Sequence, residues 1–360
     1  MRQNLQWIRL FFTSFFIPLS IIIIFNYKID SMGLFGGSEK LRYVADAISE
    51  GEMVAGLRNY NERIFQQLII QRQTQLPECI VLGSSRSMQL RQSHLNNPQQ
   101  GFFNHSVSGA SLEDHLAILG LYLKIHDRLP PKILFNIDPW IFNSNNDQKR
   151  WESLFPYYYS MATYIGALEK KSSPQIPYHY QQLINLENTK ANLIHLKKLI
   201  NNKQTDYYIT DVSMQQDSVK MSDGSFQYPY SVQKRSEADI VKRANEYAQK
   251  PVYSLENFHT LANIEIFEQL IIYLQQHGTE VVLILHPYNP IAYDKISNDE
   301  NYRQIHAVEA YLHTIAQRYT LILKGSYNPH SLHLLPTDFF DGMHGYEKVT
   351  EKILARENNL

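Results

Sequence analysis

The chain has 360 residues, of which 44% are hydrophobic and 19% are charged, so it can build a packed core. Its formal net charge is -1 at pH 7, which provides no basic field for nucleic acid, so we expect no nucleic-acid partner. The only cysteine, Cys79, excludes an intramolecular disulfide and a cysteine-based zinc framework.

The first predicted element is an apolar helix at the N-terminus. Residues 10–25 (LFFTSFFIPLSIIIIF) carry no charge, and Trp7 and Tyr27 stand at the two ends, where interfacial aromatic residues belong. With its flanks the stretch reaches about 19 residues, which is enough for one membrane crossing. Residues 26–30 (NYKID) are bulky and polar, whereas a cleavage site needs small residues. We therefore expect residues 1–27 to form an uncleaved signal anchor and not a secretory signal peptide.

The charges that flank this helix predict its orientation. Arg2 and Arg9 precede the apolar stretch, and Lys28 follows it. Because positive charge is retained on the cytoplasmic side, the N-terminus is expected in the cytoplasm. The chain is then a single-pass protein of the cytoplasmic membrane whose C-terminal domain lies on the extracytoplasmic side, in the periplasm or at the cell surface.

Beyond the anchor, residues 28–76 are interpreted as a juxtamembrane linker followed by a helix, and residues 77–360 as one domain. In that domain apolar strands alternate with amphipathic helices, which implies right-handed crossovers and therefore an α/β fold with a central parallel sheet. Cys79 is expected to be a small core residue of the first strand. The predicted strands lie at residues 79–82, within 101–109, and at 132–138, 280–285 and 320–323; the predicted helices lie at residues 87–92, 111–126, 255–277 and 301–319 and from residue 345 onward.

The region of residues 142–250 breaks this alternation. It is rich in Tyr, Gln, Asn and Lys and contains one clear helical pattern, at residues 186–200. We interpret it as an insertion that covers or extends the functional site. The lysines of its helix, Lys190, Lys197 and Lys198, are interpreted as a solvated face.

Polar motifs follow three of the predicted strands. In an open parallel sheet, ligands bind at the carboxyl ends of the strands, so these motifs are expected at one edge. Asp341 and His344 stand just before the last helix, where a loop can return to the same edge. The three motifs are Gly83-Ser84-Ser85, residues 106–109, and Asn136-Ile137-Asp138.

Together these residues provide the groups that acyl transfer needs. A serine at a helix N-terminus has backbone N–H groups beside it that stabilise negative charge, but it needs a base to become a nucleophile. His344 can be that base, and Asp341 can hold its imidazole in the correct tautomer. Taken alone, Gly-Ser-Ser is equally an ordinary helix cap, and the prediction depends on the convergence of the motifs.

The pattern resembles the SGNH/GDSL hydrolase superfamily over residues 77–141 and 255–355. Gly83-Ser84-Ser85 is similar to the Gly-Asp-Ser of its first block, which makes Ser85 the nucleophile; the Gly-Ser-Ser form resembles the membrane-anchored branch with D-alanyl transfer proteins of teichoic acid and alginate-type O-acetyltransferase domains. Gly109 matches the second-block glycine whose N–H enters the oxyanion hole. Asp341 and His344 match the final Asp-x-x-His. The resemblance implies a three-layer α/β/α flavodoxin-like fold.

The third block departs from the family. Gly-x-Asn-Asp is expected, but Asn136 stands at the glycine position and Asp138 where the oxyanion asparagine belongs. An ionised carboxylate only accepts hydrogen bonds, so Asp138 is a poor oxyanion donor. Two alternatives remain: Asn136 substitutes as donor, or the oxyanion hole consists of the Ser85 and Gly109 N–H groups. Asp138 can instead pair with Arg86.

The resemblance and the anchor imply an extracytoplasmic serine esterase or O-acyltransferase. Its partner would be an acylated polysaccharide of the cell envelope or for export, or another acyl ester, and a polytopic membrane acyltransferase could donate the acyl group. The alternative is a catalytically degenerate protein that keeps the fold for binding or assembly in envelope polysaccharide biosynthesis. No cofactor or metal is expected, although His330 and His333 have a spacing compatible with a metal. The loop at residues 286–290 either lines the substrate groove or is a plain turn.

Overall fold

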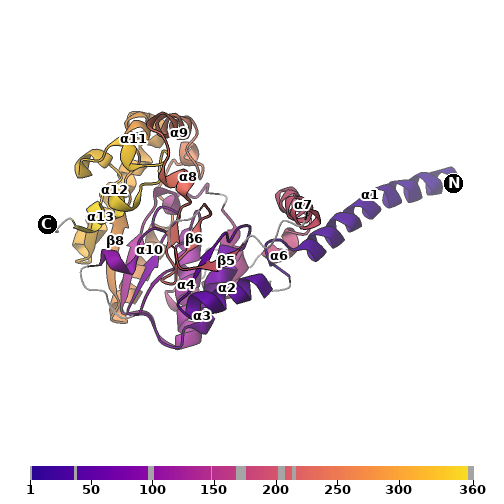
Figure 1. Ribbon diagram of the computed structural model, residues 1–360, viewed down its shortest axis with the longest axis horizontal. Helices are drawn as coiled ribbons and strands as arrows, with labels where there is room; N and C mark the ends of the chain where they lie inside the picture. The colour runs from indigo at the N-terminus through magenta and orange to yellow at the C-terminus, as the bar shows by residue number, and fades with distance from the viewer. Residues whose placement is uncertain are drawn as a thin grey trace.

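The computed structural model describes residues 2–35, 39–95, 101–146, 148–167, 176–201, 207–212 and 216–355. Its first element, α1 (Arg2–Ile29), projects away from the rest of the molecule (Figure 1). The 24 residues Gln6–Ile29 are long and apolar enough to cross a membrane, and they are not buried by the protein. The predicted N-terminal apolar helix is therefore confirmed, as a signal sequence or a membrane anchor.

A parallel sheet of five strands forms the centre of the fold. Its spatial order is β3-β2-β4-β8-β9, which is the 2-1-3-4-5 order of flavodoxin-like folds when only these strands are counted. All four residues of β2 are buried, as expected for a strand covered on both faces. The predicted α/β fold is confirmed. The strands are β2 (Cys79–Leu82), β3 (Phe102–Asn104), β4 (Lys132–Asn136), β8 (Glu280–Leu285) and β9 (Ile322–Gly325).

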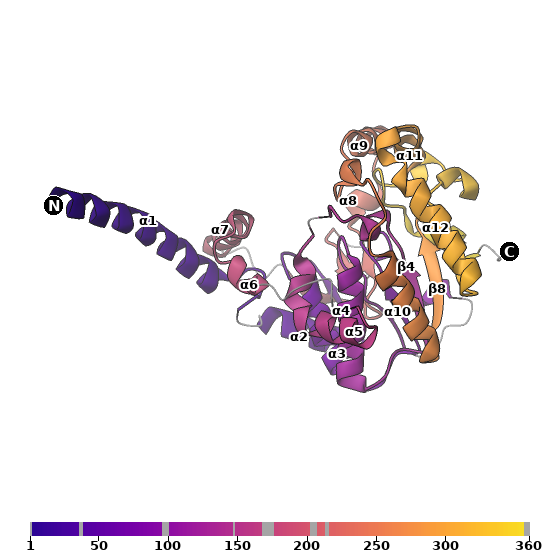
Figure 2. The ribbon, with the colours of Figure 1, turned by 180° about the vertical axis from the view of Figure 1, so that it is seen from behind.

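Alternate residues of the strands enter two different cores, which makes the domain three-layered. Ile80 and Leu82 face one core, formed largely with α4 (Leu112–His126), α10 (Ile264–Gln276) and α12 (Gln304–Arg318). Figure 2 shows α10 and α12 in front of β4 and β8. Cys79 and Val81 face the other core, where α13 (Glu347–Ala355) and loop residues cover the sheet. Cys79 is a buried core residue, as expected.

A second sheet, which the sequence did not predict, lies beside the first. Its four antiparallel strands have the order β5-β1-β6-β7, so the juxtamembrane segment pairs with the region interpreted as an insertion. Phe103 of the central sheet belongs to the core of this unit. The elements are α2 (Glu39–Ser49), β1 (Met53–Ala55), α3 (Glu62–Arg72), β5 (Tyr208–Thr210), β6 (Val219–Lys220) and β7 (Phe226–Gln227).

The remaining helices belong mainly to residues 142–250. α7 has the predicted bounds and lies beside the base of α1 (Figure 1). α5 packs on α4, and α9 packs on α11. The helices are α5 (Phe155–Tyr164), α6 (Tyr178–Gln181), α7 (Leu186–Ile200), α8 (Tyr230–Gln233), α9 (Glu237–Gln249) and α11 (Pro290–Ser297).

Two predicted helices differ from the structure. The helix expected at residues 87–92 was wrong: residues 85–89 form turns, and only a 3₁₀ turn follows at Gln92–His94. The side-chain amide of Asn104 binds the carbonyls of Ser87 and Leu90, which takes these acceptors away from a helix. The helix expected from residue 255 begins only at Ile264, because the preceding chain hydrogen-bonds to the segment after β4, with Ala262 N–H donating to Phe142 O.

Candidate active site

Ser85 lies in a tight turn directly after β2. The turn is closed by a hydrogen bond of 3.1 Å from Ser87 N–H to Ser84 O, and Ser87 Oγ donates to the same oxygen. Gly83 permits this close packing, because a Cβ there would lie 2.1 Å from Ser87 Oγ and 2.7 Å from the Cβ of Asn136. The expectation that Ser85 begins a helix was therefore wrong, because residues 85–89 form turns.

Buried polar side chains after β3 hold the Ser85 turn in place. Asn104 Nδ2 donates to Ser87 O at 2.9 Å and to Leu90 O at 2.8 Å, while its Oδ1 accepts from Ser106 N–H. The hydroxyls of Ser106 and Ser87 are 2.9 Å apart. Asn104 was not among the residues predicted for the site. Its position as a polar residue at the end of an apolar strand was the one feature of the sequence that could have indicated its role.

The loop before α13 brings His344 to Ser85. His344 Nε2 lies 2.9 Å from Ser85 Oγ, and His344 Nδ1 lies 2.8 Å from Oδ2 of Asp341. A β-bridge between Phe339 and Gly345 closes the base of the loop. Ser85, His344 and Asp341 thus form a continuous hydrogen-bonded chain with the spacing of a serine–histidine–acid triad.

Asp341 is held as an anion by its surroundings. Burial alone would raise its pKa, but the charge of His344 and three sets of hydrogen bonds outweigh burial and lower the pKa to about 2. The backbone N–H groups of Met343 and His344 donate to Oδ1 at 2.9 Å and 2.8 Å. When the His344 ring is neutral and its Nδ1 donates to this carboxylate, Nε2 can accept from the Ser85 hydroxyl.

The backbone at Gly109 has a conformation that requires glycine. Gly109 has φ +55°, and a Cβ there would lie 2.3 Å from the Tyr253 hydroxyl and 2.5 Å from Arg150 Nη2, so only glycine fits. The loop is tied to the nucleophile turn by Val107 N–H, which donates to Gly83 O at 3.0 Å. Within the described part of the chain, no protein acceptor binds the N–H of Ser85 or of Gly109.

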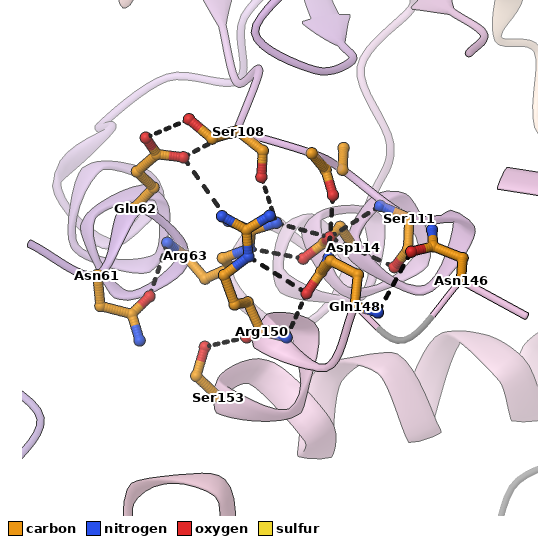
Figure 3. Close-up of polar contacts among 12 residues, drawn as sticks. Asn61, Glu62, Arg63, Ser108, Ser111, Asp114, Asn146, Gln148, Arg150 and Ser153 are labelled. Carbon is orange, nitrogen blue, oxygen red and sulfur yellow. Dashed lines mark hydrogen bonds and ion pairs between the residues drawn. The ribbon is translucent and has the colours of Figure 1, made fainter. Parts of the chain in front are cut away.

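An ion-pair network fixes the loop that carries Gly109 (Figure 3). Arg63 donates to both carboxylate oxygens of Asp114 at 2.9 Å and to the carbonyl of Ser108 at 3.0 Å. Glu62 accepts from the Ser108 hydroxyl at 2.8 Å. Arg63 and Asp114 are both buried, so the pair is rigid and protected from solvent. Nothing in the sequence linked α3 with this loop before the structure placed them together.

Asn136 and Asp138 belong to a buried cluster of hydrogen-bonded side chains. Arg86 Nη1 lies 3.1 Å from Asp138 Oδ1, so Asp138 pairs with Arg86. Asn136 donates to Asp138 Oδ2 at 3.0 Å, and its own Oδ1 contacts His286 Nδ1. All four side chains are buried. The side-chain amide of Asn136 thus has partners within this cluster.

Arg86 joins this cluster to the loop of the histidine. Its Nε donates to Met343 O at 3.1 Å, and its Nη2 donates to the carbonyl of His286. His286 is thus a buried neighbour of Asn136 and does not line the pocket described below. Burial, followed by the charge of Arg86, lowers the pKa of His286 to about 3, which keeps this imidazole neutral. Arg86 is a positioning residue for the Asp341–His344 loop.

A cavity of about 320 Å³ opens beside Ser85, where the central sheet meets the small one. Its wall combines charged and apolar side chains that were not among the predicted site residues. Burial lowers the pKa of Lys220 to about 8, although Glu62 opposes this shift. The lining includes Glu62, Lys220, Ser106, Met88, Phe226 and Tyr228.

Two groups of side chains that contain histidine have donor atoms or a spacing compatible with a metal ion. His94, Glu347 and Glu351 place one donor atom each within 4.8 Å of one another, but Arg91 lies 3.4 Å from the Glu347 carboxylate and already supplies a positive charge. His330, noted in the sequence for its spacing to His333, instead contacts Asp294 at 2.6 Å on the exposed surface. Neither cluster adjoins Ser85 in the cavity lining.

Comparisons with protein-family models and with curated proteins identify no family for this chain. No protein-family model matches the chain, and a search of curated proteins finds no significant match. What is established is an α/β fold with a central five-stranded parallel sheet and an N-terminal apolar helix. No family is identified, and the resemblance to SGNH hydrolases remains a prediction from the sequence motifs.

Proposed function

We propose that this chain is a membrane-anchored, extracytoplasmic serine esterase or O-acyltransferase of the SGNH type. The observation that carries the proposal is the hydrogen-bonded chain from Ser85 Oγ through His344 to Asp341, at 2.9 Å and 2.8 Å. A nucleophile, a base and an orienting carboxylate in contact are the groups that acyl transfer through a covalent intermediate requires.

In the proposed first half-reaction, Ser85 Oγ attacks the carbonyl carbon of an acyl ester, and its proton passes to His344 Nε2. Asp341 stays ionised and stabilises the imidazolium that forms. The oxyanion of the tetrahedral intermediate accepts hydrogen bonds from the N–H groups of Ser85 and Gly109. When the intermediate collapses, the alcohol leaves with the proton from His344, and the acyl group remains on Ser85.

The second half-reaction decides between hydrolysis and transfer. His344 takes a proton from the acceptor, whose oxygen attacks the acyl-serine carbonyl. His344 then returns this proton to Ser85 Oγ as the bond between the acyl group and the serine breaks. Water as acceptor gives an esterase, and a sugar hydroxyl gives an O-acyltransferase. The substrate class, acyl groups of a cell-envelope or exported polysaccharide, is inferred from the family resemblance together with the N-terminal helix.

Contacts of the N-terminal helix favour a retained anchor. Asn26, near its end, is buried and donates to Leu183 O and Thr189 Oγ1 at 2.8 Å each, while Asn192 donates back at 2.9 Å. Cleavage after this helix would leave these polar groups without their partner. Met32, just beyond the helix, lines the cavity beside Ser85, which is consistent with a donor delivered at the membrane by a polytopic acyltransferase.

The proposal is tested by esterase activity of the full chain in detergent micelles. p-Nitrophenyl acetate would be offered to the wild type, to Ser85→Ala and to Ser331→Ala, a control serine whose hydroxyl binds only a local carbonyl, Asn328 O. We expect hydrolysis by the wild type and the control, and its loss in Ser85→Ala. Equal rates in wild type and Ser85→Ala would reject Ser85 as nucleophile.

The altered third block keeps one alternative open to the same assay. Because Asn136 donates to Asp138, and Asp138 pairs with Arg86, the side-chain donor of the family is missing. Absence of hydrolysis and of transfer to glycan acceptors in all three proteins would favour a catalytically degenerate protein that binds or assembles envelope polysaccharide.

A further inference from the structure

α7 has an exposed apolar stripe that the domain does not cover. Leu186, Leu193 and Ile200 recur every seven residues, so they lie along one side of the helix, and their side chains are 71%, 60% and 72% exposed. Such exposure of large aliphatic side chains in register is unusual for a helix in water. Ile184, just before the helix, is 58% exposed and extends the apolar surface.

Lysines border this stripe. Lys190 and Lys197 are also seven residues apart. Each lies three residues before one stripe residue and four after another, so both lysines lie beside the stripe on the helix surface, and both are exposed. A helix with an apolar stripe edged by lysines is typical of a segment that lies in the membrane interface, because the long lysine stems allow the ammonium groups to reach the lipid headgroups. The solvent-exposed face predicted from the sequence explains why the lysines are exposed, but it does not explain why the apolar side chains of the stripe are exposed.

The position of α7 supplies a second, independent observation. Its contacts with the N-terminal segment gather at one point: Asn192 bonds to Asn26 and to the backbone N–H of Ser31, at 2.9 Å each. Figures 1 and 2 show α7 nearly end-on at the base of α1, so α7 crosses α1 instead of running along it. When α1 spans a bilayer, a crossing helix at its end lies along the membrane surface.

We propose that α7 lies in the interfacial layer of the outer leaflet, with Leu186, Leu193 and Ile200 inserted between lipids and Lys190 and Lys197 at anionic headgroups. The proposal rests on the membrane anchor of the proposed function but not on its catalysis. It also orients the domain, because α7 and α1 together fix two directions relative to the bilayer. The cavity beside Ser85, which Met32 lines, is then held close to the membrane surface.

The test measures the depth of nitroxide spin labels in the full chain, reconstituted in vesicles of phosphatidylcholine and phosphatidylglycerol. Single cysteines would be introduced as Leu193→Cys and Ile200→Cys, with Phe16→Cys in α1 as a membrane control and Ile272→Cys on α10 as an aqueous control. Burial raises the pKa of the native Cys79 to about 12, so this thiol stays unlabelled, and the unmutated chain checks that. Collision rates with oxygen, which concentrates in lipid, and with a water-soluble nickel chelate are compared.

We expect the ratio of oxygen to nickel collisions at positions 193 and 200 to be severalfold higher than at position 272 and to approach that at position 16. Lys190→Gln with Lys197→Gln should lower the ratio at position 193 in the anionic vesicles. A ratio equal to that of position 272 would overturn the proposal, and low collision rates with both reagents would also overturn it, in favour of a second protein chain on this face. A ratio at position 16 as low as that at position 272 would instead reject the membrane anchor. None of these outcomes bears on the proposed role of Ser85 as nucleophile, which is tested separately.

Discussion

Ser85 Oγ and His344 Nε2 lie 2.9 Å apart although 259 positions separate the two residues in the chain. The parallel sheet explains this contact. β2 delivers Ser85 at its carboxyl end, and the loop before α13 returns to the same edge. Asp341 shares that loop with His344, so the geometry of the base is set locally, and only the serine has to be brought in from afar.

Replacement of the orienting acid should separate catalysis from stability. We expect Asp341→Asn to lower the esterase rate by about four orders of magnitude, because the amide favours the wrong tautomer of His344. The matched control is Asp294→Asn, which removes an exposed partner of His330 and should leave the rate unchanged. Equal effects of the two substitutions would contradict the role of Asp341.

The same variant should change the acid stability of the protein. The folded pKa of Asp341 is about 2 against 3.8 for the free group, so the unfolded chain binds more protons between these values. Its contribution, of the order of 2 kcal/mol, is present above pH 4 and is lost as the pH falls through 2. Thermal unfolding of wild type and Asp341→Asn should therefore converge below pH 2, and a constant difference from pH 2 to pH 7 would be inconsistent with this pKa.

Gly109→Ala tests the loop that is proposed to form the oxyanion hole. The new Cβ requires a left-handed φ and meets Tyr253 and Arg150, so we expect a loss of about 1 kcal/mol from the backbone alone, and more from the clash. Gly166→Ala is the control, since Gly166 has φ +74° with nothing within 4 Å. Unfolding temperature and esterase rate should both fall further in Gly109→Ala, and indistinguishable variants would argue against a packed loop at Gly109.

Arg86 and Asp138 form a buried ion pair, so their contributions to the stability of the fold should depend on each other. We expect Arg86→Met to destabilise the fold by about 3–5 kcal/mol, because it leaves the Asp138 charge buried without a partner. Adding Asp138→Asn should recover part of the loss. Arg318→Met removes an exposed ion pair with Glu268 and should cost no more than about 1 kcal/mol. Urea unfolding measures all three, and additive effects of Arg86→Met and Asp138→Asn would contradict the coupling.

Lys220 should give an alkaline signature. Its folded pKa, lowered by burial to about 8 from 10.5, means that the unfolded chain binds more protons between these values, so stability rises with pH there. Relative to Lys220→Met, the wild type should gain up to about 3 kcal/mol between pH 8 and pH 10.5. Exposed Lys242→Met is the control and should show no such gain. Parallel stability curves for wild type and Lys220→Met would show that Lys220 titrates normally.

The elements that the sequence predicted well are those with strong apolar patterns. β2 and β8 have the predicted bounds, because runs of buried aliphatic residues end abruptly at Gly83 and His286. Residues 87–92 misled the prediction because their helical alternative lost its carbonyl acceptors to Asn104, a residue from another strand. A competition of that kind is decided by tertiary contacts and leaves no local signal.

The candidate site divides in the same way. Ser85, His344 and Asp341 stand in short motifs whose chemistry is readable in sequence. Glu62 and Lys220, which line the cavity, stand in no motif: Glu62 begins the helix α3, and Lys220 ends the two-residue strand β6. Only the pairing of β1 with β5 and β6 brings these segments together, and two- or three-residue strands have too little pattern for prediction.

The most direct test of the central claim is covalent labelling of the full chain with a phosphonofluoridate, followed by digestion and mass spectrometry. An activated serine displaces fluoride and retains the phosphonyl group, whereas an unactivated serine does not react. We expect the label on Ser85 in the wild type, none at that position in Ser85→Ala, and greatly slowed labelling in His344→Ala. A wild-type protein that remains unlabelled, or that carries the label on another serine, would contradict the proposal that Ser85 is the nucleophile.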